Sequence, residues 1–266
     1  MRESMILVGL LVLLSAGLVF ATGATEEGGA EPIKFGGVWP LGDITGDHGS
    51  KAAQVAIDEI NANGGILGRP VELIVIDSEL SPEKGAAALE RLATVENVDF
   101  FVGGMSSGVH LGQIPTLKKY QKVTMWTGAA ASVAEEAVGA NQDWYFHLHP
   151  WDYNQGASYL TGWTAVAEEY PEIEIDRWFV AYEEGPFGSG SFAGAQVLFS
   201  NQVVEGAAFA SAALGGGDYT AVLEQAKEFD PDVFIWAGYD ADALPIMEQS
   251  KSINFAPPLF VGAPPG

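Results

Sequence analysis

The chain has 266 residues, and its 12 Lys+Arg against 35 Asp+Glu give a formal net charge of −23. Proteins that bind nucleic acids or anionic membranes carry clusters of cations, so this charge excludes a nucleic-acid partner. Because the chain contains no cysteine, disulfides, thiolate metal sites and cysteine nucleophiles are excluded as well. Hydrophobic residues make up 48% of the chain, which predicts a folded core rather than a disordered protein.

Residues 1–24 have the pattern of a secretory signal peptide, because Arg2 precedes an apolar run over 5–20 and small residues follow. We therefore expect this segment to be cleaved and the protein to be periplasmic or otherwise extracytoplasmic. A retained membrane anchor is the alternative, although a run of about 16 residues is slightly short for the hydrocarbon core. Residues 25–32, rich in Gly and Glu, are expected to form a disordered spacer.

From Ile33 onward, short apolar runs alternate with helical patterns, which is typical of α/β folds with parallel sheets. Ser81 is an N-cap residue and Pro82 takes the first helical position, which together predict where a helix begins. The expected strands lie at 33–39, 71–77, 99–103, 122–127, 177–182, 205–211, 232–237 and 259–261. The expected helices lie at 48–61, 82–95, 153–169, 190–202 and 241–251, and two more begin near Ser107 and Asp218.

The chain changes character over 143–154, where Trp, Tyr, His and Pro are frequent and no clear period is present. We place a boundary there, between an N-terminal α/β lobe at 33–146 and a second α/β lobe at 147–266. The last predicted strand is followed by no closing helix, so the second lobe is expected to be incomplete.

Five stretches of the sequence carry recognisable motifs. They are Ile33–Gly36 with Pro40, Leu41 and Gly46; AIDEINANGGILGRP over 56–70; Asp77 with Ser81 and Pro82; FVGGMSSG over 101–108; and GDYTA over 217–221. In these motifs and their order, the chain resembles the periplasmic solute-binding proteins of branched-chain amino-acid ABC transporters, the Leu/Ile/Val-binding type. The resemblance covers residues 33–266.

The resemblance implies a type I periplasmic binding fold, in which two Rossmann-like lobes, each a parallel sheet flanked by helices, close over a small ligand. It implies a binding protein rather than an enzyme, without a cofactor. The expected partners are a small amino acid or related carboxylate and a membrane ABC permease, and the protein is expected to be a monomer. The family has three crossovers between its lobes, and only one, near 147–154, falls within this sequence. The chain is therefore expected to be truncated.

The segment 104–108 follows a predicted strand and opens a helix, so it fits both a carboxylate-binding loop and a G-x-S-x-G nucleophile elbow. In the first interpretation, the hydroxyls of Ser106 and Ser107 and the free N–H groups of the helix N-terminus hold a carboxylate. Both serines could instead only cap the helix. In the second interpretation, Ser106 is the nucleophile of a serine hydrolase, for which Asp143 before His147 or His149 is the only close acid and base pairing.

A Gly/Ala segment after the next strand should lie beside that loop. The resemblance implies a backbone contact to the ligand at Ala129. It places a threonine at the position of Ala131, which has no hydroxyl, with Ser132 next to it, so all three residues are candidate ligand contacts. A tight turn without a role in binding is the alternative explanation.

The second lobe is expected to supply an aromatic wall. Phe187 and Tyr239 match ligand-contacting tyrosines of the family, and an aromatic pair from the far lobe would cover an apolar ligand and exclude water. His48 lies near a family tyrosine at the rim of the cleft. Packing in the lobe core, or a solvated helix start for His48, are the alternatives. Further aromatic residues that could line a larger pocket are Trp39, Trp126, Trp151 and Tyr153.

The family's acidic residue for the ligand's ammonium group falls at Pro264, which provides neither a charge nor a donor. Either Glu183, Glu184 or Asp240 takes over this contact, or the ligand carries no α-ammonium group.

Two further possibilities are a ligand-sensing receptor domain and a metal site. A ligand-sensing receptor domain would keep its N-terminal helix or belong to a chain with a signalling domain. The pair His147 and His149 lies on one face of a strand, but no third ligand is near in the sequence, so no metal is expected.

Overall fold

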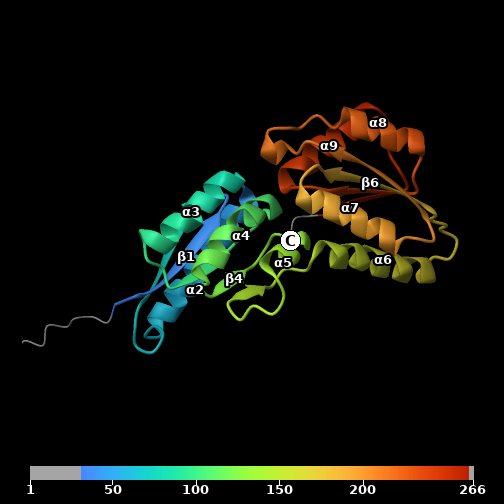
Figure 1. Ribbon diagram of the computed structural model, residues 1–266. Helices are drawn as coiled ribbons and strands as arrows, with labels where there is room; N and C mark the ends of the chain where they lie inside the picture. Colours follow the sequence, from blue (N-terminus) through green and yellow to red (C-terminus); the bar gives the residue numbers. More distant parts are fainter. Residues whose placement is uncertain (1–30, 264–266) are drawn as a thin grey trace, which may run out of the picture. The chain divides into compact units, whose positions relative to one another are not determined.

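The computed structural model describes residues 31–263 (Figure 1). The expected signal peptide, the expected spacer up to residue 30, and Pro264 lie outside these residues. The described chain forms two parallel sheets, with strand orders β2-β1-β3-β4-β5 and β7-β6-β8-β9. This confirms the expected α/β class with parallel sheets. Within residues 31–263, no helix is both long enough and apolar enough to cross a membrane.

The first sheet and its helices follow one another in strict alternation. They are β1 (Ile33–Trp39), α2 (Ile44–Ala62), β2 (Val71–Asp77), α3 (Pro82–Thr94), β3 (Phe100–Gly103), α4 (Ser107–Tyr120), β4 (Thr124–Trp126), α5 (Val133–Val138) and β5 (Tyr145–His147). The core is built from fully buried side chains of α3, β3, α4 and β4, among them Leu89, Phe101, Leu117 and Trp126. Leu89 and Leu92 are three residues apart on α3, so one face of this helix is buried.

The second sheet follows the same rule. Its elements are α6 (Asp152–Glu169), β6 (Arg177–Glu183), α7 (Pro186–Leu198), β7 (Val203–Phe209), the 3₁₀ turn η1 (Ala212–Leu214), α8 (Thr220–Phe229), β8 (Val233–Ala237), α9 (Asp240–Ser252) and β9 (Leu259–Ala263). The central strand β8 is buried along its whole length, as its sequence VFIWA requires for a parallel strand covered on both faces. Helix α8 begins near Asp218, as expected, and its buried face consists of Val222, Leu223 and Ala226, next to the buried N-cap residue Tyr219.

Helix α2 begins earlier than the sequence predicts, at Ile44 rather than His48. The reason is local. Asp43 has extended backbone dihedrals and its carboxylate accepts the N–H of Thr45 at 2.9 Å, so it acts as the N-cap. The buried residues of α2 are Gly46 and Ile57, whereas Ala52, Val55 and Ala56 are exposed, so the apolar spacing along this helix marks neither its first turn nor its buried face.

Helix α7 also begins earlier, at Pro186 rather than near residue 190. Proline favours the first helical position because it has no N–H to leave unpaired there. The Glu183 carboxylate accepts the N–H of Gly188 at 2.8 Å and thereby satisfies a donor of the first turn. The strand that follows is correspondingly shifted, to Val203–Phe209 from the expected 205–211.

The aromatic segment over 143–154 contains regular structure. Tyr145–His147 forms β5, which pairs in parallel with β4 at the edge of the first sheet, and α6 begins at Asp152. The sequence predicted neither β5 nor the short helix α5, because three-residue and six-residue elements are too short to show a period. The extents of the two lobes, 33–146 and 147–266, stay a prediction.

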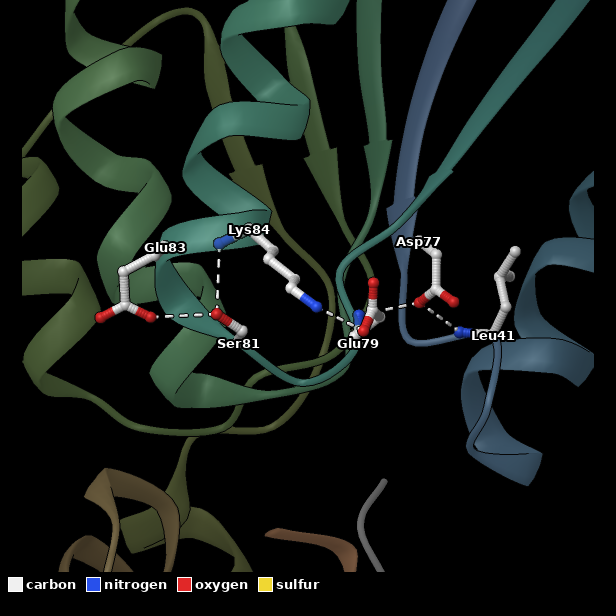
Figure 2. A network of polar contacts seen from close by, with 6 residues as sticks. All are labelled: Leu41, Asp77, Glu79, Ser81, Glu83 and Lys84. Atoms are coloured by element: carbon white, nitrogen blue, oxygen red, sulfur yellow. Dashed lines mark hydrogen bonds and ion pairs between the residues drawn. The ribbon is translucent and has the colours of Figure 1, made fainter.

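A network of polar contacts shapes the turn between β2 and α3 (Figure 2). The Asp77 carboxylate accepts the N–H groups of Leu41 at 2.9 Å and of Glu79 at 2.8 Å, and so joins this turn to the loop after β1. Ser81 Oγ accepts the N–H of Lys84 at 3.2 Å and caps α3, as expected, while Lys84 Nζ pairs with the Glu79 carboxylate. The loop after β1 leads into α2, so this network fixes the entry to one wall of the cavity described next.

Candidate functional site

A cavity of about 180 Å³ lies where strands of both sheets end. In parallel α/β sheets, ligands bind outside the carboxyl ends of the strands, because the loops there meet at one edge. Every lining residue comes from the end of β1 or from a segment that follows the carboxyl end of β1, β3, β4, β5, β6 or β8. The lining residues are Trp39, Thr45, Gly49, Gly104, Met105, Ser107, Thr127, Gly128, Ala129, Ala130, His149, Phe187 and Tyr239.

Free N–H groups characterise the first-sheet side of this cavity. The N–H groups of Ser107, Gly128 and Ala130 donate to no acceptor within residues 31–263. By contrast, Ala129 donates to the carbonyl of Met105 at 3.0 Å. Ser107 is the first residue of α4, so its N–H lies at the positive end of the helix dipole. Free donors at a helix N-terminus can hold an anion such as a carboxylate.

His147, in β5, supports the loop that carries two of these donors. Its Nε2 lies 3.0 Å from the carbonyl oxygen of Gly128 and 3.1 Å from that of Ala129, so Nε2 carries the proton that both acceptors require. Ala129 has a φ of 69°, a left-handed conformation that is unfavourable for a residue with a side chain. The imidazole stacks on Trp151 at 3.7 Å with 5° between the planes, and burial lowers the pKa of His147, which favours its neutral form.

Trp39 forms an apolar part of the same wall and is 4% exposed. Two glycines leave room for its ring. A Cβ atom on Gly103 would lie 2.8 Å from the indole, and one on Gly49 would lie 3.1 Å from Nε1. Gly103 also has a φ of 112°, which side chains rarely adopt. The position of Trp39 therefore depends on glycines from β3 and α2.

The second-sheet side of the cavity consists of aromatic side chains. Phe187 lies in the first turn of α7 and Tyr239 lies at the N-cap of α9, with their ring centroids 6.5 Å apart. The Tyr239 hydroxyl lies 3.4 Å from Ser106 Oγ. Burial, followed by the negative charge of Glu183, raises the pKa of Tyr239, so its hydroxyl stays protonated. This side covers the cavity with two rings and one neutral hydroxyl group.

Glu183, Glu184 and Asp240 were considered above as contacts for an ammonium group of the ligand, but each is hydrogen-bonded elsewhere or exposed to solvent. Glu183 is buried, and its two oxygens accept the N–H groups of Gly185 at 2.5 Å and Gly188 at 2.8 Å. Burial raises its pKa, which favours the neutral carboxyl. Asp240 is exposed and accepts the Thr45 hydroxyl at 3.0 Å, and Glu184 is exposed as well. None of the three lines the cavity.

The structure brings only some of the predicted site residues to the cavity. Ser107, Ala129, Phe187 and Tyr239 line it; Ser106, Ala131, Ser132 and His48 do not. Ser106 caps α4 by accepting the N–H of Val109 at 3.5 Å, which is the alternative considered for it. The roles of all eight residues in ligand binding stay predictions.

Of the other three residues outside the cavity, two donate their N–H groups to nearby side chains and one is exposed to solvent. The N–H of Ala131 donates to Ser107 Oγ at 3.1 Å, and that of Ser132 donates to Asp152 at 3.1 Å. His48 is exposed on α2.

Several lining residues were not singled out by the sequence. Thr127, Gly128 and Ala130 directly follow β4, so the rule that ligands bind at the ends of parallel strands could have found them. Thr45 and Gly49 lie in the first turns of α2, which the sequence placed too late. Of the four further aromatic candidates, only Trp39 reaches the cavity, whereas Trp126 is packed in the core of the first sheet.

The geometry around Ser106 does not assemble a hydrolase triad within the described chain. Nε2 of His147 faces main-chain carbonyls, and Nδ1 of His149 contacts the carbonyl of Pro150 at 2.7 Å. His110 is buried and packs on Trp126, and burial lowers its pKa to about 3, but its Nε2 contacts Tyr145. Within residues 31–263, no group of three His, Asp or Glu side chains is placed to hold a metal ion.

The fold and the cavity thus define a class: a protein with two parallel α/β sheets and a small-molecule site at the carboxyl ends of their strands. Residues 32–266 match the model of a periplasmic binding protein family, and the chain belongs to this family. Among curated proteins, a Leu/Ile/Val-binding protein homologue 7 of Brucella abortus (strain 2308) is 23% identical over 260 residues. The match covers 92% of this chain and 63% of the relative, so the chain spans less than two thirds of that protein's length.

Solved structures agree on the fold. The branched-chain amino acid transporter substrate-binding protein LivJ of Streptococcus pneumoniae, in complex with isoleucine, superposes with a TM-score of 0.70 and 22% identity, over 87% of this chain and 64% of LivJ. A solute-binding protein of an ABC transporter from R. palustris, in complex with benzoate, gives 0.72 and 17% identity, over 86% and 62%. The chain therefore has the type I periplasmic binding fold. The relatives are binding proteins, so the hydrolase and receptor alternatives are not favoured.

Proposed function

We propose that this protein is the substrate-binding component of an ABC importer that captures a small amino acid or a related carboxylate. The observation that carries the proposal is the set of free N–H groups on Ser107, Gly128 and Ala130 at one cavity. Isoleucine and benzoate, which are bound by two proteins of the same fold, both contain a carboxylate. A carboxylate bound in this cavity would offer an acceptor to these donors.

The mechanism we propose is closure over the ligand. The loops after β3 and β4 hold the carboxylate, and Phe187 and Tyr239 cover the apolar part of the molecule. Two contacts already bridge the two sides, Thr45 Oγ1 to Asp240 at 3.0 Å and Ser106 Oγ to Tyr239 at 3.4 Å. We propose that the two sides belong to two lobes, 33–146 and 147–266, and that these lobes hinge about the segment near Trp151.

The setting of this activity is likewise a proposal, supported by family membership. The protein acts as a monomer outside the cytoplasm after cleavage of residues 1–24, and delivers its ligand to a membrane ABC permease. It uses no cofactor and performs no reaction on the ligand.

Calorimetric titration with acids and their primary amides tests the carboxylate site directly. The panel pairs L-leucine with L-leucinamide, and benzoate with benzamide. We expect at least one acid to bind, and its amide to bind at least tenfold more weakly, because an amide has no charge to interact with the free N–H groups. The absence of binding by every acid, or equal affinity for an acid and its amide, would contradict the proposal.

A further inference from the structure

We propose that the ligand is a carboxylate that carries no ammonium group, such as a simple aliphatic or aryl carboxylic acid. This inference rests on the proposed function and names the ligand class of the same site. Four features of the cavity support it: the neutral lining, the occupied carbonyl groups, the positions of the acids, and the apolar walls.

Among the described residues 31–263, those that line the cavity provide no carboxylate side chain. An ammonium group has three N–H donors and no acceptor, so it requires several oxygen acceptors when it leaves water. The side-chain oxygens available are those of Thr45, Ser107, Thr127 and Tyr239. Each is a neutral hydroxyl, and burial of a cation among neutral groups is unfavourable.

The main-chain carbonyl groups of the lining residues are largely occupied. The Trp39 carbonyl accepts the N–H of Ser78 at 3.0 Å, and the Ala130 carbonyl accepts that of Asp152 at 2.8 Å. The carbonyls of Gly128 and Ala129 both accept the His147 ring. In the same loops the N–H groups of Gly128 and Ala130 are free. Within residues 31–263, the lining carbonyls of Gly104, Thr127 and His149 accept no N–H group, so the acceptors left for a cation at this cavity are neutral.

The nearby acids are held by other groups. Glu183 uses both of its oxygens to cap α7, and Asp240 accepts the Thr45 hydroxyl outside the lining. Asp242, below Tyr239, is fully buried and accepts the N–H of Tyr239 at 2.7 Å. It also accepts the hydroxyl group of Tyr219 at 2.5 Å. None of these acids lines the cavity, nor does Asp43, which accepts the N–H of Thr45 at 2.9 Å.

The remaining walls suit an apolar body. The rings of Trp39, Phe187 and Tyr239 contribute the largest lining side chains, and all three are at most 4% exposed. The cavity volume of about 180 Å³ suits a small ligand. An apolar chain or ring in this space removes its surface from water without leaving a polar group unpaired.

The test uses matched pairs that differ only in the α-ammonium group, titrated calorimetrically at neutral pH. The pairs are 4-methylpentanoate with L-leucine, and 3-phenylpropanoate with L-phenylalanine. We expect the acid without the ammonium group to bind at least tenfold more tightly in the pair that binds. An amino acid that binds as tightly as its partner, or more tightly, would overturn this inference and leave the proposed carboxylate site intact. If no member of either pair binds and benzoate also fails to bind, the proposed function is overturned together with the inference.

Two conservative variants test whether Asp240 binds an ammonium group of the ligand. Asp240→Asn removes the acid that accepts the Thr45 hydroxyl, and Glu184→Gln is the matched control on an exposed acid. We expect Glu184→Gln to bind the tightest acid of the panel within twofold of the unmodified protein, and Asp240→Asn to change the affinities for an acid and for its amino-acid partner by the same factor. A tenfold loss of amino-acid binding in Asp240→Asn alone would show that Asp240 serves an ammonium group, and would overturn the inference.

Discussion

The two sides of the cavity differ in the kind of group they present. The side that follows β3 and β4 presents main-chain N–H groups held in position by short loops, whereas the side that follows β6 and β8 presents the rings of Phe187 and Tyr239. Main-chain donors are directional and suit a charged group, and rings suit an apolar one. In the proposed function, the first side orients the ligand through its carboxylate and the second side covers it. Substitutions on each side should therefore have different consequences.

The largest effect is expected on the first side, from Gly104→Ala. Gly104 has a φ of 96°, and an added Cβ would collide with Nε1 of the buried Trp126. We expect the free energy of unfolding to fall by about 2–4 kcal/mol, from backbone strain together with overpacking, as measured by denaturant titration. Gly64→Ala is the matched control, because Gly64 has a φ of 94° and open space around its Cβ position. Equal losses in the two variants would show that the contact with Trp126 contributes nothing.

On the second side, Phe187→Ala removes half of the aromatic cover. Affinity for the tightest acid of the panel should fall by about 2 kcal/mol, or roughly 30-fold, because the ring's contact area with the ligand is lost. Phe192→Ala makes the same truncation in the same helix, at a ring that stacks on Tyr182 instead. Calorimetry should find the affinity of Phe192→Ala close to that of the unmodified protein. A similar loss in both variants would place Phe187 in the helix packing rather than in the cover.

His147→Phe tests whether ligand binding requires the hydrogen bonds that hold the loop after β4 in place. The substitution keeps a ring against Trp151 and removes the donor to Gly128 and Ala129. We expect binding to weaken about tenfold, since one lost hydrogen bond is worth about 1 kcal/mol and the loop is no longer fixed.

A second substitution, Ala129→Gly, should restore part of the affinity in that background, because glycine adopts φ of 69° without strain. A merely structural role for His147 predicts no such recovery.

Ser106→Ala and Ser107→Ala should separate two neighbouring serines. Ser106 caps α4, so its loss should lower stability by about 1 kcal/mol with little change in affinity. Ser107 lines the cavity, so its loss should weaken carboxylate binding by about 1–2 kcal/mol. Thermal unfolding and calorimetry of both variants check this. The reverse pattern would return the binding role to Ser106.

The smallest effect concerns Glu183, whose pKa is raised by burial on the second side. The native state then holds this proton more strongly than the unfolded chain, where a Glu pKa is about 4.3. The stabilisation by the proton is complete below that pH and is lost as pH rises through the folded pKa. Relative to Glu183→Gln, the unmodified protein should therefore lose stability as pH rises from about 4 toward neutrality. A constant difference between the two unfolding curves across this range would contradict the assignment.

The sequence by itself determined the features that depend on neighbours along the chain. Ser81 and Pro82 marked the start of α3, the run VFIWA marked a buried strand, and the segment 101–108 marked a strand, a loop and a helix N-terminus. The motifs in their order identified the family and with it the fold. A cap, a strand run or a helix start is set by residues within a few positions of one another, so sequence patterns can report it.

Only the tertiary structure decided which side chains act together. The sequence could not rank Ser107 above Ser106, because the choice depends on which hydroxyl faces the loop after β4. From the sequence, His147 was considered only together with His149, as a possible metal pair. Parallel pairing of β4 with β5 instead places its ring in hydrogen-bond contact with the carbonyl of Ala129. It offered Glu183 as a ligand for an ammonium group, but the early start of α7 uses that carboxylate as a cap. Contacts between segments that are distant in the chain arise from sheet order and helix packing, which no local pattern encodes.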